Sequence, residues 1–161
     1  MPNPAEVLSP ESPVFWQHIG TALLCGGAIG CERQLRGKVA GIRTSILICL
    51  GTEVFVSLGA SFPSEHSDPT RVLGQVVTGI GFIGAGVILA REGRILGVTT
   101  AAVIWMLAAL GALIGMGYLQ ASLVLTLVSL VVLVGVEKVD RLRERRRTPG
   151  GSGPYETQGS D

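Results

Sequence analysis

One carboxylate lies in the middle of a long apolar segment. Glu53 is the only charged residue of TSILICLGTEVFVSLGASF, residues 44–62. An ionised carboxylate at that depth of a bilayer costs a few kcal/mol even on insertion scales, so the side chain should face protein. Two interpretations stay open: a proton or cation site, or a protonated carboxyl group that donates a hydrogen bond. The hydroxyl groups expected at similar depth are those of Thr21, Thr78 and Thr126.

The remaining polar residues do not resemble a catalytic or metal-binding set. His18 and His66 have no serine, aspartate or cysteine at a spacing typical of a nucleophile and its base. The three cysteines show no CxxC spacing, and the sequence has no phosphate-binding loop. We therefore expect no enzymatic activity, no metal and no cofactor. His18 is expected one helical turn from the outer surface, where Gln75 is its predicted partner.

A second polar cluster is predicted where several apolar segments meet the cytoplasm. Its members are Glu32, Arg33, Gln34, Arg43, Thr44, Arg91, Thr99 and Thr100. Arginine side chains at such positions hydrogen-bond the last carbonyls of a helix and pair with nearby carboxylates. The alternative is a binding surface for a partner or an anion.

The elements that position these residues follow from the distribution of charge. Only 16% of the 161 residues are charged, against about 25% in soluble domains, and they lie between long apolar runs. A membrane helix needs about 20 predominantly apolar residues. Five segments fit: 14–31, 44–62, 71–90, 97–117 and 119–136. The last two require a tight turn near Gly117, and one long bent helix is the alternative there.

The basic residues predict the orientation of these spans. Lys and Arg are enriched on the cytoplasmic side of membrane proteins. Five spans place every basic residue except Arg71 on one side, whereas merging the last two spans would move the basic tail to the other. The sequence therefore predicts an all-α, compact bundle of five transmembrane helices with the N-terminus outside and the C-terminus cytoplasmic.

Glycine is concentrated in the third span. Residues 71–90 hold Gly74, Gly79, Gly81, Gly84 and Gly86, although each glycine weakens a helix in water by about 1 kcal/mol relative to alanine. Small residues let helices approach closely in lipid, where no hydrophobic drive joins them. We therefore predict helix packing for this span, as a central helix, and for two further pairs. Those pairs are Gly26 with Gly30 in the first span and Gly111 with Gly115 in the fourth. A glycine-lined ion path is the rival interpretation.

The ends of the chain differ from its middle. Residues 1–13 have no basic residue before the first apolar run, so we expect an extracytoplasmic segment and not a signal peptide. Residues 137–161 begin with EKVDRLRERRR and end in a Gly-rich, polar stretch that we expect to be disordered. The basic part fits anionic lipid head groups. Nucleic acid is not an expected partner.

Three blocks together resemble one family. GAIGCERQLRGKVAGIRTSILICLG (27–51), DPTRVLGQVVTGIGFIGAGVIL (68–89) and GVTTAAVIWMLAALGALIGMG (97–117) are similar to the MgtC/SapB family of bacterial inner-membrane proteins. The resemblance covers about residues 27–136, and does not supply Glu53. It implies a polytopic protein of the bacterial inner membrane that is linked to growth under magnesium limitation.

The resemblance also implies a regulatory function. The best-studied members of the family act on the proton-translocating ATP synthase, and longer members carry a cytoplasmic C-terminal domain. We accordingly expect a non-enzymatic regulator of magnesium or proton-energy homeostasis. Its expected partners are the lipid bilayer and another membrane protein or a second copy of the chain. Transport of magnesium or another ion through Glu53 is the alternative.

Overall fold

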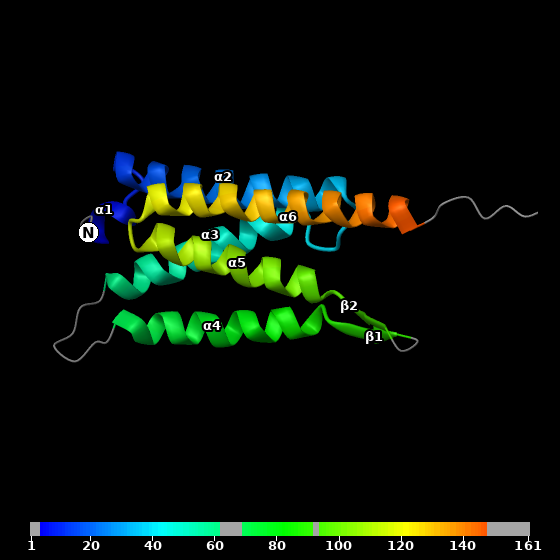
Figure 1. Ribbon diagram of the computed structural model, residues 1–161. Helices are drawn as coiled ribbons and strands as arrows, with labels where there is room; N and C mark the ends of the chain where they lie inside the picture. The colour runs from blue at the N-terminus through cyan, green and yellow to red at the C-terminus, as the bar shows by residue number, and fades with distance from the viewer. Residues whose placement is uncertain (1–3, 62–68, 92–93, 148–161) are drawn as a thin grey trace, which may run out of the picture. The chain divides into compact units, whose positions relative to one another are not determined.

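The computed structural model describes residues 4–61, 69–91 and 94–147 (Figure 1). The described elements are α1 (Pro4–Val7), α2 (Pro13–Leu35), α3 (Ile42–Ala60), α4 (Pro69–Gly86), β1 (Leu89–Arg91), β2 (Arg94–Leu96), α5 (Val98–Gly115) and α6 (Leu119–Arg147). The chain divides into two units, Met1–Leu130 and Val131–Asp161. All packing described below lies within the first unit.

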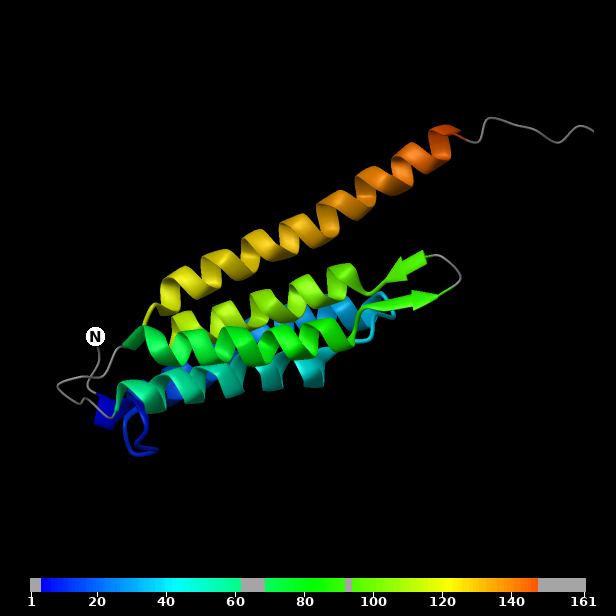
Figure 2. The same cartoon turned by 90° about the horizontal axis from the view of Figure 1, so that it is seen from below.

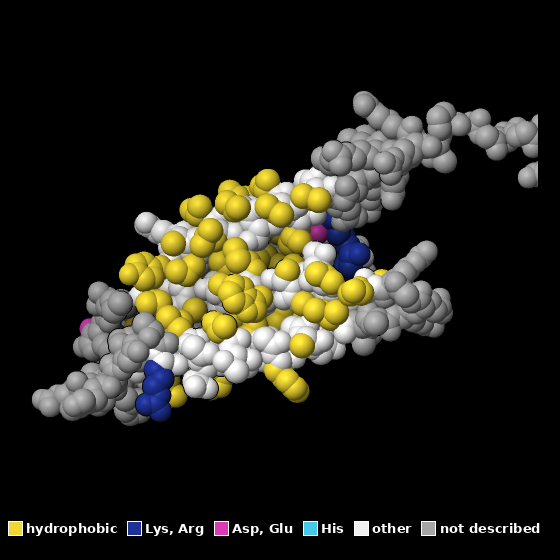
Figure 3. All heavy atoms as spheres, turned by 60° about the horizontal axis from the view of Figure 1, so that its bottom comes forward, with side chains coloured by type: hydrophobic (Ala, Val, Ile, Leu, Met, Phe, Trp, Pro, Cys, Tyr) yellow, Lys and Arg dark blue, Asp and Glu magenta, His cyan; other side chains and the backbone are white. Residues whose placement is uncertain are grey.

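The expected all-α fold with five long helices, α2 to α6, is confirmed for the part of the chain that the structure describes. Four of these helices have segments long and apolar enough to cross a membrane. They are Pro13–Leu35, Ile42–Ala60, Val98–Gly115 and Leu119–Val136. Hydrophobic side chains cover the middle of the face shown in Figure 3, with charged side chains toward its ends. This distribution is that of a multi-pass membrane protein.

The third predicted span is wrong in its length. The prediction ran to residue 90, but α4 ends at Gly86 and the chain turns into a β-hairpin. In this hairpin Leu89 pairs with Leu96 and Arg91 with Arg94. Figure 2 shows the hairpin extending from the neighbouring ends of α4 and α5. The apolar part of α4, Arg71–Gly86, is shorter than the four segments that could cross a membrane.

Local sequence signals account for the helix boundaries. The Ser12 hydroxyl oxygen accepts a hydrogen bond from the Val14 N–H at 3.2 Å, and Pro13 occupies the first helical turn of α2. Pro69 likewise begins α4. Between α5 and α6 the Gly117 N–H donates to the Ile114 carbonyl, and Gly117 has a φ of 85°. The predicted tight turn is therefore confirmed, because a left-handed residue interrupts the helix there.

The first part of the predicted basic tail is helical. The helix α6 continues to Arg147, so residues 137–147, expected as a tail, are helical. Charged residues with alternating sign are compatible with a solvated helix. The predicted disordered end, 148–161, lies outside the described residues.

The central helix of the first unit is α3 and not the glycine-rich α4. The most extensive packing joins α3 to α2 and to α5, whereas α4 packs mainly on α5. The core between α2, α3 and α5 contains the fully buried side chains of Ile29, Cys49, Leu107 and Leu110. Large apolar residues such as Phe82 and Leu47 are exposed on the outside, as expected for side chains that face lipid.

Candidate functional site

Glycine residues bring α2 and α5 close to the backbone of α3. A Cβ atom on Gly26 would lie 2.7 Å from Ile46 Cα, and one on Gly30 would lie 2.6 Å from Ile42 Cα. Further along α3, a Cβ on Gly111 would collide with the Cys49 carbonyl, and one on Gly115 would lie 2.8 Å from the Glu53 carbonyl oxygen. The structure thus places both predicted pairs in helix packing, and α3 is their common partner.

This close packing encloses a polar group of three side chains. Nδ1 of His18, from α2, lies 3.1 Å from Oε1 of Glu53, from α3. The Ser57 hydroxyl, one turn further along α3, donates to the same Oε1 at 2.9 Å. It also lies 3.4 Å from the Gly115 carbonyl oxygen of α5. The three side chains are at most 3% exposed, so they form one buried cluster that joins three helices.

The chemistry of this His18–Glu53–Ser57 cluster is that of a shared proton. A carboxylate that accepts from an imidazole N–H and a hydroxyl retains a favourable environment inside a low-dielectric bundle. The cluster is suited to hold a proton between α2 and α3.

The structure does not bring the threonines to Glu53. Each donates to the carbonyl four residues earlier in its own helix: Thr21 to Gln17 at 2.7 Å, Thr78 to Gly74 at 2.9 Å and Thr126 to Ser122 at 2.8 Å. This acceptor is available to any helical threonine without a second helix. The predicted pairing of His18 with Gln75 is also wrong. His18 is buried against α3 and contacts Glu53, whereas Gln75 is exposed on α4.

Part of the second predicted cluster does come together. The Arg33 Nη2 of α2 donates to the Thr100 hydroxyl oxygen of α5 at 2.6 Å. Glu32 pairs with Arg36 at 2.6 Å. The Gln34 side-chain oxygen accepts from the Ile42 N–H at 3.3 Å and thereby holds the α2–α3 connection.

For the other members of that cluster the structure gives no mutual contact among the described residues. Arg43, Thr44 and Thr99 are exposed, and no interaction between them is found. Arg91 ends the strand β1, and its side chain lies outside the described residues. The convergence of all eight residues on one binding surface therefore stays a prediction.

The glycines of α4 are not packed inside this chain. A Cβ atom on Gly74, Gly79, Gly81 or Gly86 would meet nothing within 4 Å, and one on Gly84 would make ordinary contact with Ala101 at 3.8 Å. Ile80 and Gly84 are buried against the bundle, so the small-residue face of α4 points away from it. The expectation of α4 as a helix packed on several sides is wrong within this chain.

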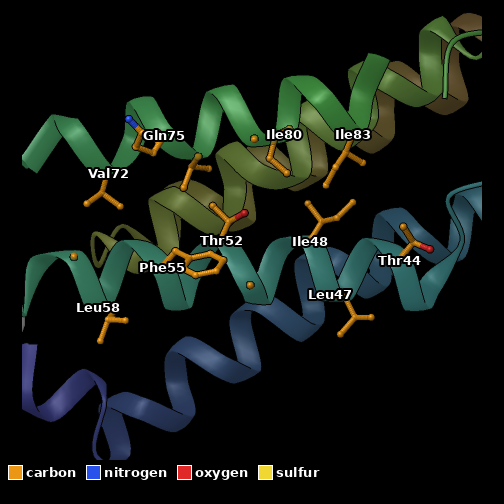
Figure 4. A pocket seen from close by; sticks show the side chains of 14 residues that line it. Thr44, Leu47, Ile48, Thr52, Phe55, Leu58, Val72, Gln75, Ile80 and Ile83 are labelled. Carbon is orange, nitrogen blue, oxygen red and sulfur yellow. The ribbon is translucent and has the colours of Figure 1, made fainter. Parts of the chain in front are cut away.

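A groove runs along the other side of α4, between it and α3. Its volume is about 890 Å³, and its lining is almost entirely apolar. Figure 4 shows Ile48 and Phe55 of α3 on one wall and Val72, Ile80 and Ile83 of α4 on the other. Such a lining suits hydrocarbon, either an acyl chain or an apolar side chain.

Cysteine, histidine and acidic residues do not gather into a metal site among the described residues, where no group of three or more is found. Cys25, Cys31 and Cys49 are free thiols, and Cys25 and Cys49 are buried.

Comparison with known proteins identifies the family. The model of the MgtC family matches residues 19–142. The chain is 46% identical over 119 residues to "Putative magnesium transporter YhiD" of Escherichia coli K12, an alignment that covers 70% of this chain and 55% of that protein. It is 44% identical to "Protein MgtC" of Brucella abortus and 40% identical to "Protein MgtC" of Salmonella typhimurium, over 69% and 68% of this chain.

These alignments cover only part of each relative. The chain spans 46% of the length of both MgtC proteins, about half of each. No solved structure matches the chain. Since the family model covers most of the sequence and the described helices are those of a multi-pass membrane protein, the chain belongs to the MgtC family.

Proposed function

We propose that this protein is a non-enzymatic regulator of magnesium or proton-energy homeostasis in the bacterial inner membrane, and that it acts by docking on another membrane complex. The names of its relatives include a magnesium transporter and the MgtC proteins, and they support the link to magnesium. The resemblance described above makes the proton-translocating ATP synthase the first complex to test.

The observation that carries this proposal is the free face of α4. Gly74, Thr78, Gly81 and Ala85 lie along one side of the helix, and all four are exposed. Small residues in this arrangement let a second helix approach backbone to backbone, where packing and dispersion stabilise the pair in lipid. Within this chain no described helix uses the face, so it is suited to a partner outside the chain.

The test is inhibition of ATP-driven proton pumping in liposomes. The purified protein is reconstituted with the ATP synthase, and proton uptake is followed with a pH-sensitive dye. Gly81→Leu places a bulky side chain on the free face of α4 without contacting the bundle. The protein concentration needed for half-maximal inhibition should rise about tenfold, which corresponds to a typical energy of helix association in membranes. Gly20→Leu in α2 is the matched control, because a Cβ there also meets nothing within 4 Å.

Two results contradict this proposal. Wild-type protein that leaves proton uptake unchanged excludes the ATP synthase as the partner. Equal inhibition by the Gly81→Leu and wild-type proteins excludes the α4 face.

Ion transport through Glu53 is the second candidate function. The buried His18–Glu53–Ser57 cluster favours it, because an ionisable group at membrane depth with a proton-sharing partner is a common element of proton pathways. The test is magnesium and proton flux into liposomes that contain only this protein. Saturable flux that is lost in Glu53→Gln supports transport and contradicts a purely regulatory role, whereas flux equal to that of empty liposomes rejects it.

A further inference from the structure

Arg33 is a buried cation whose charge is not fully compensated by the residues that the structure describes. The residue is only 2% exposed, and its Nη2 donates to the neutral Thr100 hydroxyl. Its Nε is buried and has no hydrogen-bond partner. Among the described residues no carboxylate forms an ion pair with it. Burying a charge without an ion pair costs several kcal/mol, and the neighbouring charge of Glu32 offsets only part of this cost.

The guanidinium points at the beginning of a helix. Thr100 is the third residue of α5, and Gly97, which precedes the helix, provides no side-chain cap. The first hydrogen bond into this helix is donated by the Ala101 N–H to the Gly97 carbonyl. The N–H groups of the preceding turn thus have no acceptor in the helix, and they form the positive end of its dipole.

The backbone before α5 keeps this turn free of side chains. Gly97 has a φ of 89°, and a Cβ there would collide with the Val87 carbonyl. Serine, threonine or aspartate, the usual capping residues, would be strained at this position. Any hydrogen-bond acceptor for the first N–H groups of α5 must therefore come from another part of the protein or from a ligand.

The charged groups around Arg33 are mostly basic. Glu32, the neighbouring acid, makes its ion pair with Arg36. Its second oxygen, Oε2, is buried without a hydrogen-bond partner, and the charge of Glu32 attracts that of Arg33. Arg36, Lys38 and Arg43 follow on the α2–α3 connection and the first turn of α3, and they outweigh this single acid.

We propose that Arg33, the Thr100 hydroxyl and the first-turn N–H groups of α5 bind an anionic phosphate group. Phosphate oxygens accept charge-assisted hydrogen bonds from guanidinium in a planar, paired geometry. They also bind the free N–H groups at a helix N-terminus. Thr100 accepts from Arg33, and its own O–H remains to donate to the anion. Two sources share this chemistry: the head group of an anionic phospholipid and free inorganic phosphate.

The experiment measures the thermal stability of the full-length protein in a neutral detergent. Melting is followed by circular dichroism in three series of additions at matched ionic strength. These are sodium phosphate, sodium chloride, and mixed micelles of phosphatidylglycerol or phosphatidylcholine. A ligand that binds only the folded state raises the Tm with concentration. We expect the Tm to rise with phosphate or with phosphatidylglycerol, and not with chloride or phosphatidylcholine.

Arg33→Gln identifies the residue responsible. Without phosphate this variant should melt at the wild-type temperature or higher, because it removes a buried charge that is only partly compensated. Its apparent affinity for the anion should fall by about tenfold or more, the usual effect of losing a charge-assisted hydrogen bond. Arg43→Gln is the matched control, since Arg43 is exposed, and should change the affinity by less than about twofold. Thr100→Val serves as a second variant that keeps the charge and removes the hydroxyl.

The outcomes separate the sources and the alternatives. A response to phosphate alone assigns a free anion, and a response to phosphatidylglycerol alone assigns a lipid head group. A wild-type Tm that responds to neither, or a response that persists in Arg33→Gln, overturns the proposal. If Arg33→Gln does not fold, an unchanged response in Thr100→Val overturns it as well. The free face of α4 plays no part in these measurements, so their outcome does not depend on the proposed regulatory function.

Discussion

At the scale of single residues, His18 and Glu53 depend on each other. Each is nearly inaccessible to solvent, and each has the other as a partner across the α2–α3 interface. Removing one member of a buried pair leaves the other without a partner. This typically lowers the free energy of unfolding by about 3–5 kcal/mol, and we expect a similar loss here. Removing both members leaves no unpaired ionisable group, and the Ser57 hydroxyl keeps the Gly115 carbonyl as its neighbour.

We therefore predict that His18→Leu destabilises the protein by about 3 kcal/mol and that His18→Leu/Glu53→Leu is more stable than this single variant. The measurement is the free energy of unfolding in a denaturing-detergent titration, read by circular dichroism. Additive effects of the two substitutions, determined with Glu53→Leu, would contradict a coupled pair, because contacting residues show non-additivity.

The sequence contained a signal for the pairing of His18 with Glu53. It appears when the depth of each residue is counted from the helix ends and not from the middle of each span. His18 follows the start of α2 by five residues and Glu53 precedes the end of α3 by seven. Since consecutive antiparallel helices share an end, these counts place both side chains at similar depth. Ser57 follows Glu53 by four residues, the spacing of side chains on one helix face. Which partner Glu53 takes still depends on the rotation of α2 about its axis.

At the scale of helices, glycine has two different consequences in this protein. On α2 and α5 it allows the backbones to approach α3, and a methyl group would meet main-chain atoms. On α4 a methyl group would meet open space. The same residue type therefore serves tight packing at one place and leaves a free surface at another.

A matched pair of substitutions tests this difference. We predict that Gly111→Ala is strongly destabilising, by about 2–3 kcal/mol, because its Cβ would collide with the Cys49 carbonyl and α3 and α5 must separate. Gly79→Ala should be neutral or stabilising by up to about 1 kcal/mol, since alanine is the better helix former. Unfolding free energies of the two variants check this, and equal losses would contradict the packing of α3 at the centre.

At the scale of the whole molecule, the number of membrane crossings decides whether the two termini lie on the same side of the membrane or on opposite sides. The segment that decides this count is α4, whose apolar part, Arg71–Gly86, is shorter than the four candidate membrane spans. Its 18 residues rise about 27 Å at about 1.5 Å per residue, close to the 30 Å hydrocarbon core. A small local thinning of the bilayer accommodates such a difference.

We predict that the N-terminus lies outside and the C-terminus lies in the cytoplasm, because this orientation leaves nearly all basic residues inside. The measurement uses reporter fusions, alkaline phosphatase for the outer side and green fluorescent protein for the cytoplasm, at each end in turn. Fluorescence from the C-terminal fusion and phosphatase activity from the N-terminal fusion are expected. Termini on the same side would show that α4 does not cross.

The sequence by itself determined the number and approximate limits of the long helices, the turn at Gly117 and the glycine pairs of α2 and α5. These features follow from local properties: apolar length, backbone conformation and the absence of a side chain. Only the tertiary structure decided that α3 is central, that Glu53 meets His18 and that Arg33 reaches the beginning of α5. The physical reason is that each contact depends on the rotation of helices about their axes, and many distant side chains determine that rotation together.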